Sequence, residues 1–206
     1  MEEQTISRSE RIARIITEVL SPPLVGIAVL GIITYAVTSS LEQFLVWWAI
    51  SAGAIAIVPL AFVLWGVRRG RFTDHHITLR EQRTLPFIVG LVSVCAAIAV
   101  MVVFHAPPDV LAITITTMIG GVVLMGLTRI TKPSMHAATV AGSAVVMVIH
   151  FGLGPYTIPL FVLVPIVAWG RIKIKAHTLY HVVLGSLTGI ALAIVLFGLG
   201  RSYLLG

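Results

Sequence analysis

Long apolar stretches separated by short polar segments make up most of this 206-residue chain. Six stretches contain no Asp, Glu, Lys or Arg, and they cover residues 19–41, 43–67, 84–108, 110–128, 137–170 and 176–200. A helix that crosses the hydrocarbon core of a bilayer needs about 20 apolar residues. The pattern therefore predicts an all-α, polytopic membrane helix bundle of six to seven transmembrane helices, with spans at 20–37, 44–66, 86–104, 110–127, 137–152, 157–169 and 179–199.

The fifth and sixth spans are short, and their sequence allows two interpretations. Gly152-Leu153-Gly154-Pro155 interrupts the stretch 137–169, which can form either two helices or one kinked, re-entrant element. Gly-Pro is a turn signal, so two helices are favoured. Pro86 and Pro133 lie where two helices should begin, a position at which the missing amide costs nothing.

The first 19 residues carry a pattern of their own. Ser7 and Glu10 have the spacing of a capping box. Four large apolar residues lie on one helical face and three arginines on the opposite one, namely Ile12, Ile15, Ile16 and Leu20 against Arg8, Arg11 and Arg14. We expect 1–19 to be an amphipathic interfacial segment, an ordinary cytosolic lead-in being the alternative. A single transmembrane domain at 20–206, with its core at about 68–200, should follow.

Composition and charge agree with an integral membrane protein, since 58% of the residues are hydrophobic and 11% are charged. Seven spans place the amino terminus and the loops at 67–85, 128–136 and 170–178 on one side, with thirteen of the fourteen Lys and Arg residues. The positive-inside rule makes that side cytoplasmic, in a bacterial or archaeal plasma membrane. The net charge of +6 then reflects membrane orientation and an anionic ligand rather than nucleic acid. The pattern predicts no particular oligomeric state.

The sequence offers no obvious ligands for a metal. Cys95 is the only cysteine, and no set of Cys and His residues has the spacing of a zinc site. Paired aspartates that would hold Mg²⁺ on a diphosphate are also missing, which argues against a metal-dependent prenyltransferase. We therefore expect neither a metal nor another cofactor.

The first polar loop between spans contains His76, Arg80 and Arg83 at positions i, i+4 and i+7. On a helix these three residues share one face. Guanidinium groups aimed from one face suit a multi-oxygen anion such as phosphate, which they bind through paired, charge-assisted hydrogen bonds. The alternative is a positive-inside loop in which the arginines pair with Asp74 or Glu81.

The second loop runs directly into the fifth span as Lys132-Pro133-Ser134-Met135-His136. Ser134 and His136 should therefore lie near a helix amino terminus, where free amides and the helix dipole favour an anion. A charged His136 can donate a proton to a departing oxygen, and a bound phosphate favours that charge. The alternative is simple anchoring of an imidazole at the membrane interface.

The third loop carries Arg171 and leads into a stripe in which His177, His181, Gly185 and Gly189 recur at every fourth residue. The glycines permit close approach of another helix. Of two stacked imidazoles, one can attack phosphorus while the other holds its far ring nitrogen in the right tautomer.

Together the three segments resemble the type 2 phosphatidic acid phosphatase superfamily of lipid phosphate and prenyl diphosphate phosphatases. That family carries Lys-x6-Arg-Pro, then Pro-Ser-Gly-His, then Ser-Arg-x5-His-x3-Asp. The matching segments here are His76-x6-Arg83, Pro133-Ser134-Met135-His136 and Gly170-Arg171-x5-His177-x3-His181, in the same order and with the same internal spacings. The resemblance covers roughly residues 76–189.

The resemblance implies a metal-independent phosphatase with a phosphohistidine intermediate. His177 would be the nucleophile, and His136 the acid that protonates the leaving lipid oxygen. Arg83 and Arg171 would hold the phosphoryl oxygens. Ser134 and neighbouring amides would complete a cradle that stabilises the developing charge.

Four positions differ from the family pattern: His76 replaces Lys, Met135 replaces Gly, Gly170 replaces Ser and His181 replaces Asp. Arg80 or Lys132 could supply the lost lysine charge. His181 can accept a hydrogen bond from His177, but it cannot stabilise a transient imidazolium as a carboxylate does. Loss of the orienting aspartate in a serine protease costs about 10⁴-fold in rate.

Two functions therefore stay open. In the first, the chain hydrolyses a lipid or isoprenoid phosphate or diphosphate whose tail lies in the bilayer. In the second, a drifted site binds such a lipid without hydrolysing it, as a regulator, a carrier or a catalyst of another isoprenoid reaction. An ion channel would need charged groups in the middle of its spans, and no Asp, Glu, Lys, Arg or His lies in the middle of a predicted span.

Overall fold

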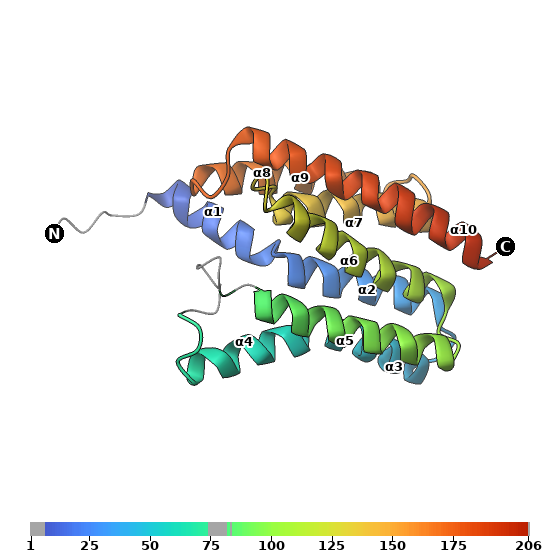
Figure 1. The fold of residues 1–206 in the computed structure, drawn as a ribbon. Helices are drawn as coiled ribbons and strands as arrows, with labels where there is room; N and C mark the ends of the chain where they lie inside the picture. Colours follow the sequence, from blue (N-terminus) through green and yellow to red (C-terminus); the bar gives the residue numbers. More distant parts are fainter. Residues whose placement is uncertain (1–6, 74–81, 83, 206) are drawn as a thin grey trace. The chain divides into compact units, whose positions relative to one another are not determined.

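A computed structural model describes residues 7–73, 82 and 84–205 of the chain. All regular elements of this part are helices (Figure 1). Helix α1 (Arg8–Val19) begins with the predicted capping box, in which the Glu10 amide donates to Ser7 Oγ and the Ser7 amide donates to Glu10 Oε2, both at 3.2 Å.

Each predicted span coincides with a helix or with an unbroken run of helices. In chain order these are α2 (Pro22–Val37); α3 (Leu41–Ala52), the π-helix η1 (Gly53–Ile57) and α4 (Val58–Arg68); α5 (Thr84–Val103); α6 (Pro108–Leu127); α7 (Met135–Phe151); the 3₁₀ helix η3 (Ile158–Val162) and α8 (Leu163–Lys173); and α9 (Leu179–Leu192), the π-helix η4 (Ala193–Gly198) and α10 (Leu199–Leu205). The stretch 137–169 is thus two helices joined by a turn, as Gly152-Leu153-Gly154-Pro155 indicated.

Four of these helices are long and apolar enough to cross a membrane, at Leu41–Arg68, Thr84–Val103, Pro108–Leu127 and Leu179–Tyr203. A fifth is obtained if α1 and α2, which are bent by 45°, form one span. The length and composition of these described helices are consistent with an integral membrane protein. Helix α7 has 17 residues and α8 has 11, so both are shorter than these candidates.

The chain forms two compact units. The first comprises the described parts of Met1–Val29 and Ile119–Gly206, and the second comprises those of Leu30–Met118. The second unit has a small core formed by Ala54, Val94 and Ala97. The Ser93 hydroxyl of α5 donates, at 2.7 Å, to the carbonyl of Ala54, which belongs to the π-helix η1. The residues that define the candidate site belong to the first unit.

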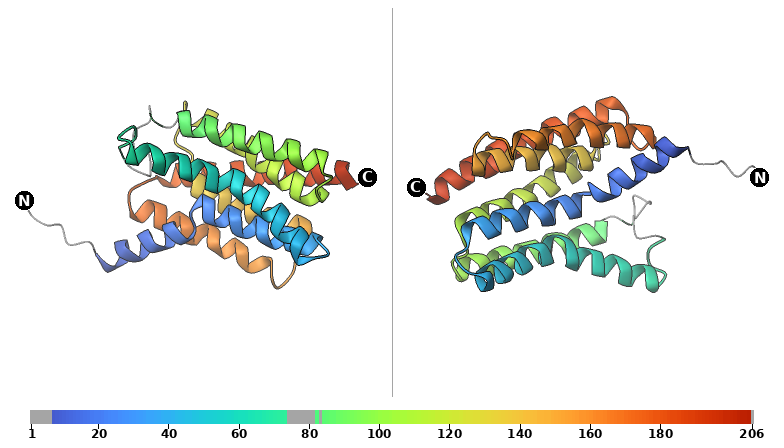
Figure 2. Two further views of the ribbon diagram at one scale, coloured as in Figure 1. Left: turned by 90° about the horizontal axis from the view of Figure 1, so that it is seen from below. Right: turned by 180° about the vertical axis from the view of Figure 1, so that it is seen from behind.

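Helices α7 and α9 lie side by side in the first unit, as Figure 2 shows for the gold and dark orange ribbons. Small residues make this contact possible. A Cβ on Gly142 would lie 2.9 Å from the Gly189 carbonyl oxygen, and one on Gly189 would collide with the Ala138 backbone. The predicted glycine stripe of α9 therefore faces α7 and permits direct backbone contact.

Helix α1 packs against α8 in the same unit. Ala13 and Thr17 are buried, whereas Ile12 is 44% and Ile15 58% exposed. Of the predicted amphipathic face, Ile12 and Ile15 are thus exposed, whereas Ile16 lies near Gly170 of α8 and Leu20 packs against the core cluster that contains Val167. The position of α1 in a membrane interface stays a prediction.

Candidate functional site

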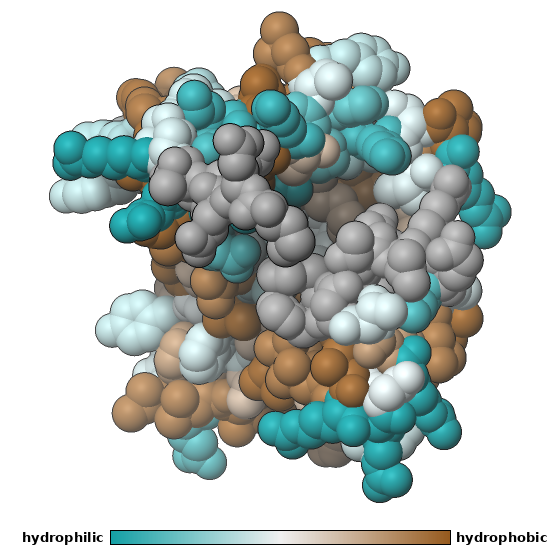
Figure 3. All heavy atoms as spheres, turned by 90° about the vertical axis from the view of Figure 1, so that its left-hand side faces the viewer, coloured by the Kyte–Doolittle hydropathy of each residue, from teal (hydrophilic) through white to brown (hydrophobic). Residues whose placement is uncertain are grey.

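Three of the predicted polar positions come together at one end of the first unit. His136 lies in the first turn of α7, Arg171 in the last turn of α8, and His177 just before α9. The charges of Arg171 and His177 both act on His136, and the ring centroids of His177 and His181 are 6.0 Å apart. Hydrophilic side chains gather at this end of the unit among apolar ones (Figure 3).

The turn between α8 and α9 explains the spacing of Arg171 and His177. The Lys175 amide donates to the Ile172 carbonyl at 2.9 Å and the Ala176 amide to the Arg171 carbonyl at 3.0 Å, which is a Schellman motif. The His177 amide also donates to the Arg171 carbonyl, at 3.3 Å. The backbone of His177 is thereby tied to that of Arg171, so the five intervening residues hold both side chains at the same end of α8.

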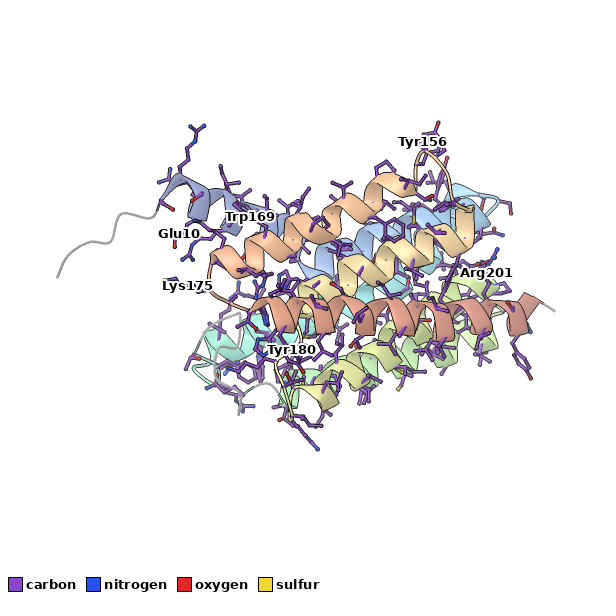
Figure 4. All side chains as sticks on the ribbon, turned by 90° about the horizontal axis from the view of Figure 1, so that it is seen from above. Glu10, Tyr156, Trp169, Lys175, Tyr180 and Arg201 are labelled. Atoms are coloured by element: carbon purple, nitrogen blue, oxygen red, sulfur yellow. The ribbon has the colours of Figure 1, made fainter. Side chains whose placement is uncertain are left out.

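Lys175 occupies the left-handed position of this motif, with φ of +56°. Glycine is the usual residue there, because a side chain adds strain. Figure 4 shows Lys175 on this turn and Tyr156 on the α7–α8 turn at the opposite end of the unit. The cluster therefore lies at the end of α7 at which the helix begins.

Ser134 is fully buried and connects α7 to α9. Its amide donates to the His181 carbonyl at 2.9 Å, and its hydroxyl accepts from the Ala137 amide at 3.3 Å as the N-cap of α7. A Cβ on Gly185 would collide with the Ser134 backbone. The amide and the hydroxyl lone pair of Ser134 thus have structural partners, and its predicted contact with phosphate stays a prediction.

His181 lies beside His177 but bonds elsewhere. The Thr178 amide donates to His181 Nδ1 at 3.5 Å, and Thr178 Oγ1 lies 3.1 Å from the same atom. His177 Nδ1 is buried and has no hydrogen-bond partner among the described residues. The expected hydrogen bond that would orient His177 through its Nδ1 is therefore absent from the described structure, because the first turn of α9 engages His181 instead.

Burial and nearby positive charge keep both histidines of the cluster neutral. Both lie outside the predicted spans 137–152 and 179–199. Desolvation, followed by the charges of Arg171 and His177, lowers the pKa of His136 from its ordinary value of 6.5 to about 4. Desolvation, followed by Arg171 and His181, lowers the pKa of His177 to about 4 as well. The backbone of Lys132 partly opposes the lowering of the His177 pKa.

Arg171 is half-buried, and its Nε has no hydrogen-bond partner among the residues that the structure describes. Burial lowers the pKa of Arg171, and the Glu18 carboxylate at the end of α1 acts in the opposite direction. The cluster thus contains two buried nitrogen atoms, Arg171 Nε and His177 Nδ1, that lack partners. Buried polar groups without hydrogen bonds are rare and call for an explanation, such as a missing ligand.

Helix α1 contributes to the cluster in a way that the sequence did not indicate. The backbone of Thr17 acts to raise the pKa of His136, and the Glu18 carboxylate acts to raise that of Arg171. In the sequence, only the small residues on one face of α1 could have indicated this contact. The isoleucines dominate the apolar periodicity of the helix and therefore obscured that face.

The remaining predicted ligands are placed only in part. Lys132 is exposed, and its charge acts on His177. His76, Arg80 and Arg83 lie outside the described residues. In the described part of the chain, no three His, Cys, Asp or Glu side chains are grouped as a metal site would require. Comparison with protein-family models, with curated proteins and with solved structures finds no match.

Proposed function

We propose that the chain is a metal-independent membrane phosphatase that hydrolyses a lipid or isoprenoid phosphate or diphosphate through a phosphohistidine. The observation that carries the proposal is the cluster of His136, Arg171 and His177, in which Arg171 Nε and His177 Nδ1 are buried without partners among the described residues. A phosphoryl group offers oxygens to the guanidinium and an electrophilic phosphorus to the imidazole. One ligand would thus engage both orphaned nitrogens.

The electrostatics of the cluster suit the first chemical step. Because the pKa of His177 is about 4, its ring is neutral at physiological pH and carries the lone pair that a nucleophile needs. In this step the N–P bond forms as the P–O bond to the lipid breaks, and His136 gives its proton to the departing oxygen. Water then attacks the phosphohistidine, returns a proton to His136 and releases phosphate.

His136 needs a proton before it can act as the acid, yet its pKa is about 4 in the empty site. A phosphate dianion next to Arg171 would raise the pKa of His136 again, because it offsets the positive charge that disfavours the imidazolium. The substrate itself would therefore charge the acid. This coupling supports an anion as the ligand of the cluster.

The proposal includes the topology expected from the charges. In it, all seven helical stretches cross the membrane, the amino terminus and the cluster lie on the cytoplasmic side, and the membrane is a bacterial or archaeal plasma membrane. The lipid tail would stay in the bilayer beside apolar helices, while the headgroup reaches the ends of α7, α8 and α9. His76, Arg80, Arg83 and Lys132 are further candidates for the phosphate.

One observation favours the alternative, a protein that binds a phosphorylated lipid without hydrolysing it. His181 Nδ1 accepts from the Thr178 amide, and among the described residues only the Lys132 backbone acts to raise the pKa of His177. No carboxylate of the described residues is therefore seen to stabilise an imidazolium at His177. An enzyme built this way would be slow, and a regulator or carrier would not need such a group.

Release of phosphate by purified protein separates the two functions. The protein in detergent is incubated with a fluorescent prenyl diphosphate or a phosphatidate in the presence of EDTA. We expect wild type to release phosphate, His177→Ala to release none, and the control His105→Asn to match wild type. His105 is the matched control because it lies in the second unit with φ of +56°, a conformation that Asn tolerates. Lipid binding without release by wild type would favour the alternative.

A further inference from the structure

We propose that the end of helix α4 binds the headgroup of an anionic glycerophospholipid from the surrounding bilayer. The site consists of Trp65, Arg68, Arg69 and Arg71, which lie where the candidate span Leu41–Arg68 ends. These residues belong to the second unit, whereas the cluster of His136, Arg171 and His177 belongs to the first. The proposal therefore does not depend on the phosphatase function.

Three arginines converge on one face at the end of α4. Arg68 and Arg69 follow Trp65 at positions i+3 and i+4, so their side chains share a face with the indole. Arg71 lies beyond the helix, and its guanidinium carbon is 5.0 Å from the centroid of the Trp65 ring. All three arginines are exposed. Three positive charges thus surround one indole.

The turn after α4 is what returns Arg71 to Trp65. Gly70 has φ of +68°, and its amide donates to the Val67 carbonyl at 3.0 Å. The Arg71 amide donates to the Gly66 carbonyl at 2.8 Å, which completes a Schellman motif. The backbone of Arg71 is therefore held against the last turn of the helix.

The next residue, Phe72, anchors the turn from the other side. Its ring packs over Gly66, where an added Cβ would collide with it, and its centroid lies 5.9 Å from that of Phe62. Phe72 is only 8% exposed. The chain is thus fixed both before and after the guanidinium-bearing residue, so Arg71 is organised in advance for a ligand.

The arginine side chains are not needed to end the helix. Basic side chains near the carboxyl end of a helix often bind its last carbonyls. Here the backbone amides of Arg69, Gly70 and Arg71 donate to the carbonyls of Trp65, Val67 and Gly66. The sequence 43–73 also contains no Asp or Glu. These features leave the guanidinium donors to an external acceptor.

An anionic phospholipid matches this arrangement. Guanidinium groups bind phosphate oxygens through paired hydrogen bonds, and basic residues at the end of a span attract anionic lipids. Trp65 is 42% exposed, and indoles favour the level of the headgroups. Val58 and Ala61, seven and four residues before Trp65, are exposed on the same face. Acyl chains would therefore find apolar surface next to the arginines, which favours a lipid over free phosphate.

Tryptophan quenching by brominated lipid tests the location. The full-length protein is reconstituted in phosphatidylcholine vesicles that contain a minor fraction of brominated phosphatidylglycerol or of phosphatidylcholine with the same brominated chains. We expect brominated phosphatidylglycerol to quench wild type more strongly, and Trp65→Phe to lose this difference. Trp169→Phe should keep it. Trp169 is the matched control because it is 43% exposed and lies two residues before Arg171.

Two results of this experiment would overturn the inference. One is equal quenching of wild type by the two brominated lipids. The other is a difference that is lost in Trp169→Phe and kept in Trp65→Phe, because it would place the lipid at the candidate phosphatase cluster.

Native mass spectrometry of the protein in detergent tests the arginines. We expect Arg71→Gln to weaken phosphatidylglycerol binding about fivefold, and Arg71→Lys to weaken it less because it keeps the charge but loses the planar fork. Arg129→Gln, which removes an exposed arginine after α6, should bind as wild type does. Unchanged affinity in the triple variant Arg68→Gln, Arg69→Gln and Arg71→Gln would overturn the inference. Displacement of the lipid by an equal concentration of glycerol phosphate would also do so, since it would show that the acyl chains contribute nothing.

Discussion

Binding of a divalent anion to Arg171 should be coupled to protonation of the neighbouring histidines. Sulfate is a suitable probe because its charge stays constant between about pH 4.5 and 8. In the empty site, the pKa of His136 is about 4. Burial is the largest cause of this shift and remains when an anion binds, so a full return of the pKa to 6.5 sets an upper limit; that difference of 6.5 − 4 = 2.5 units corresponds to an affinity change of at most about 300-fold for this one group.

The direction of the pH dependence depends on whether the empty or the sulfate-bound protein holds a proton on His136. Between about pH 4 and 6.5, the sulfate complex holds a proton on His136 that the empty protein lacks, so binding takes up a proton and strengthens as the pH falls. Isothermal titration calorimetry in buffers of different ionisation enthalpy measures this uptake directly. We expect an uptake of up to about one proton per sulfate at pH near 5 in wild type, and less in His136→Asn.

The control is His105→Asn, which leaves the cluster intact and should take up protons as wild type does. Sulfate affinity that is equal at pH 5 and pH 7 would refute the reasoning, since it would mean that the bound anion does not face the histidines. Binding that survives Arg171→Ala would refute the placement of the anion.

Three further predictions concern stability and the motif residues. The pKa values of His136 and His177 are lowered in the folded protein, so the unfolded chain binds more protons below pH 6.5. Thermal unfolding in detergent should therefore occur at lower temperature as the pH falls towards 4. The variant His136→Asn should show a weaker dependence on pH. Gly189→Ala should destabilise the protein by about 1–3 kcal/mol in denaturant titrations because it forces α9 off the Ala138 backbone, whereas Gly121→Ala, with open space around its Cα, should be neutral or stabilising. His181→Asp should raise the pKa of His177 in nuclear magnetic resonance titrations and increase phosphate release if the chain is a phosphatase, since it places a carboxylate beside the imidazole; an unchanged pKa would show that residue 181 does not face the ring.

The helices and part of the site could be predicted from the sequence because both depend on local patterns. Charge-free stretches indicated the helical segments. The recurrence of His or Gly at every fourth residue from His177 to Gly189 indicated the face of α9 that contacts α7. The sequence also placed Ser134 near a helix amino terminus, and Ser134 is the N-cap of α7, whereas Pro133, expected at the helix start, precedes this cap. These signals depend on residues within one or two turns of each other.

The contacts of α1 and His181 could not be predicted in the same way, because each depends on a competition between partners. Periodicity gives most weight to large apolar residues such as Ile12 and Ile15, yet these two are exposed, and the small residues Ala13 and Thr17 are the buried ones beside Gly170. The spacing of His177 and His181 suggested a hydrogen bond between the two rings. The Thr178 amide at the start of α9 donates to His181 Nδ1 instead. The span count also depends on helix length, and α7 and α8 are each too short to satisfy that criterion alone.

The shortness of α7 sets the depth of the cluster in the proposed topology. Its 17 residues extend about 25 Å at 1.5 Å per residue, less than the roughly 30 Å of a typical hydrocarbon core. A helix of this length draws its ends inwards or thins the bilayer around them. His136, in the first turn of α7, would then lie at the level of the lipid headgroups rather than above it. A lipid phosphate could therefore reach Arg171 by lateral diffusion, with its tail still fully immersed.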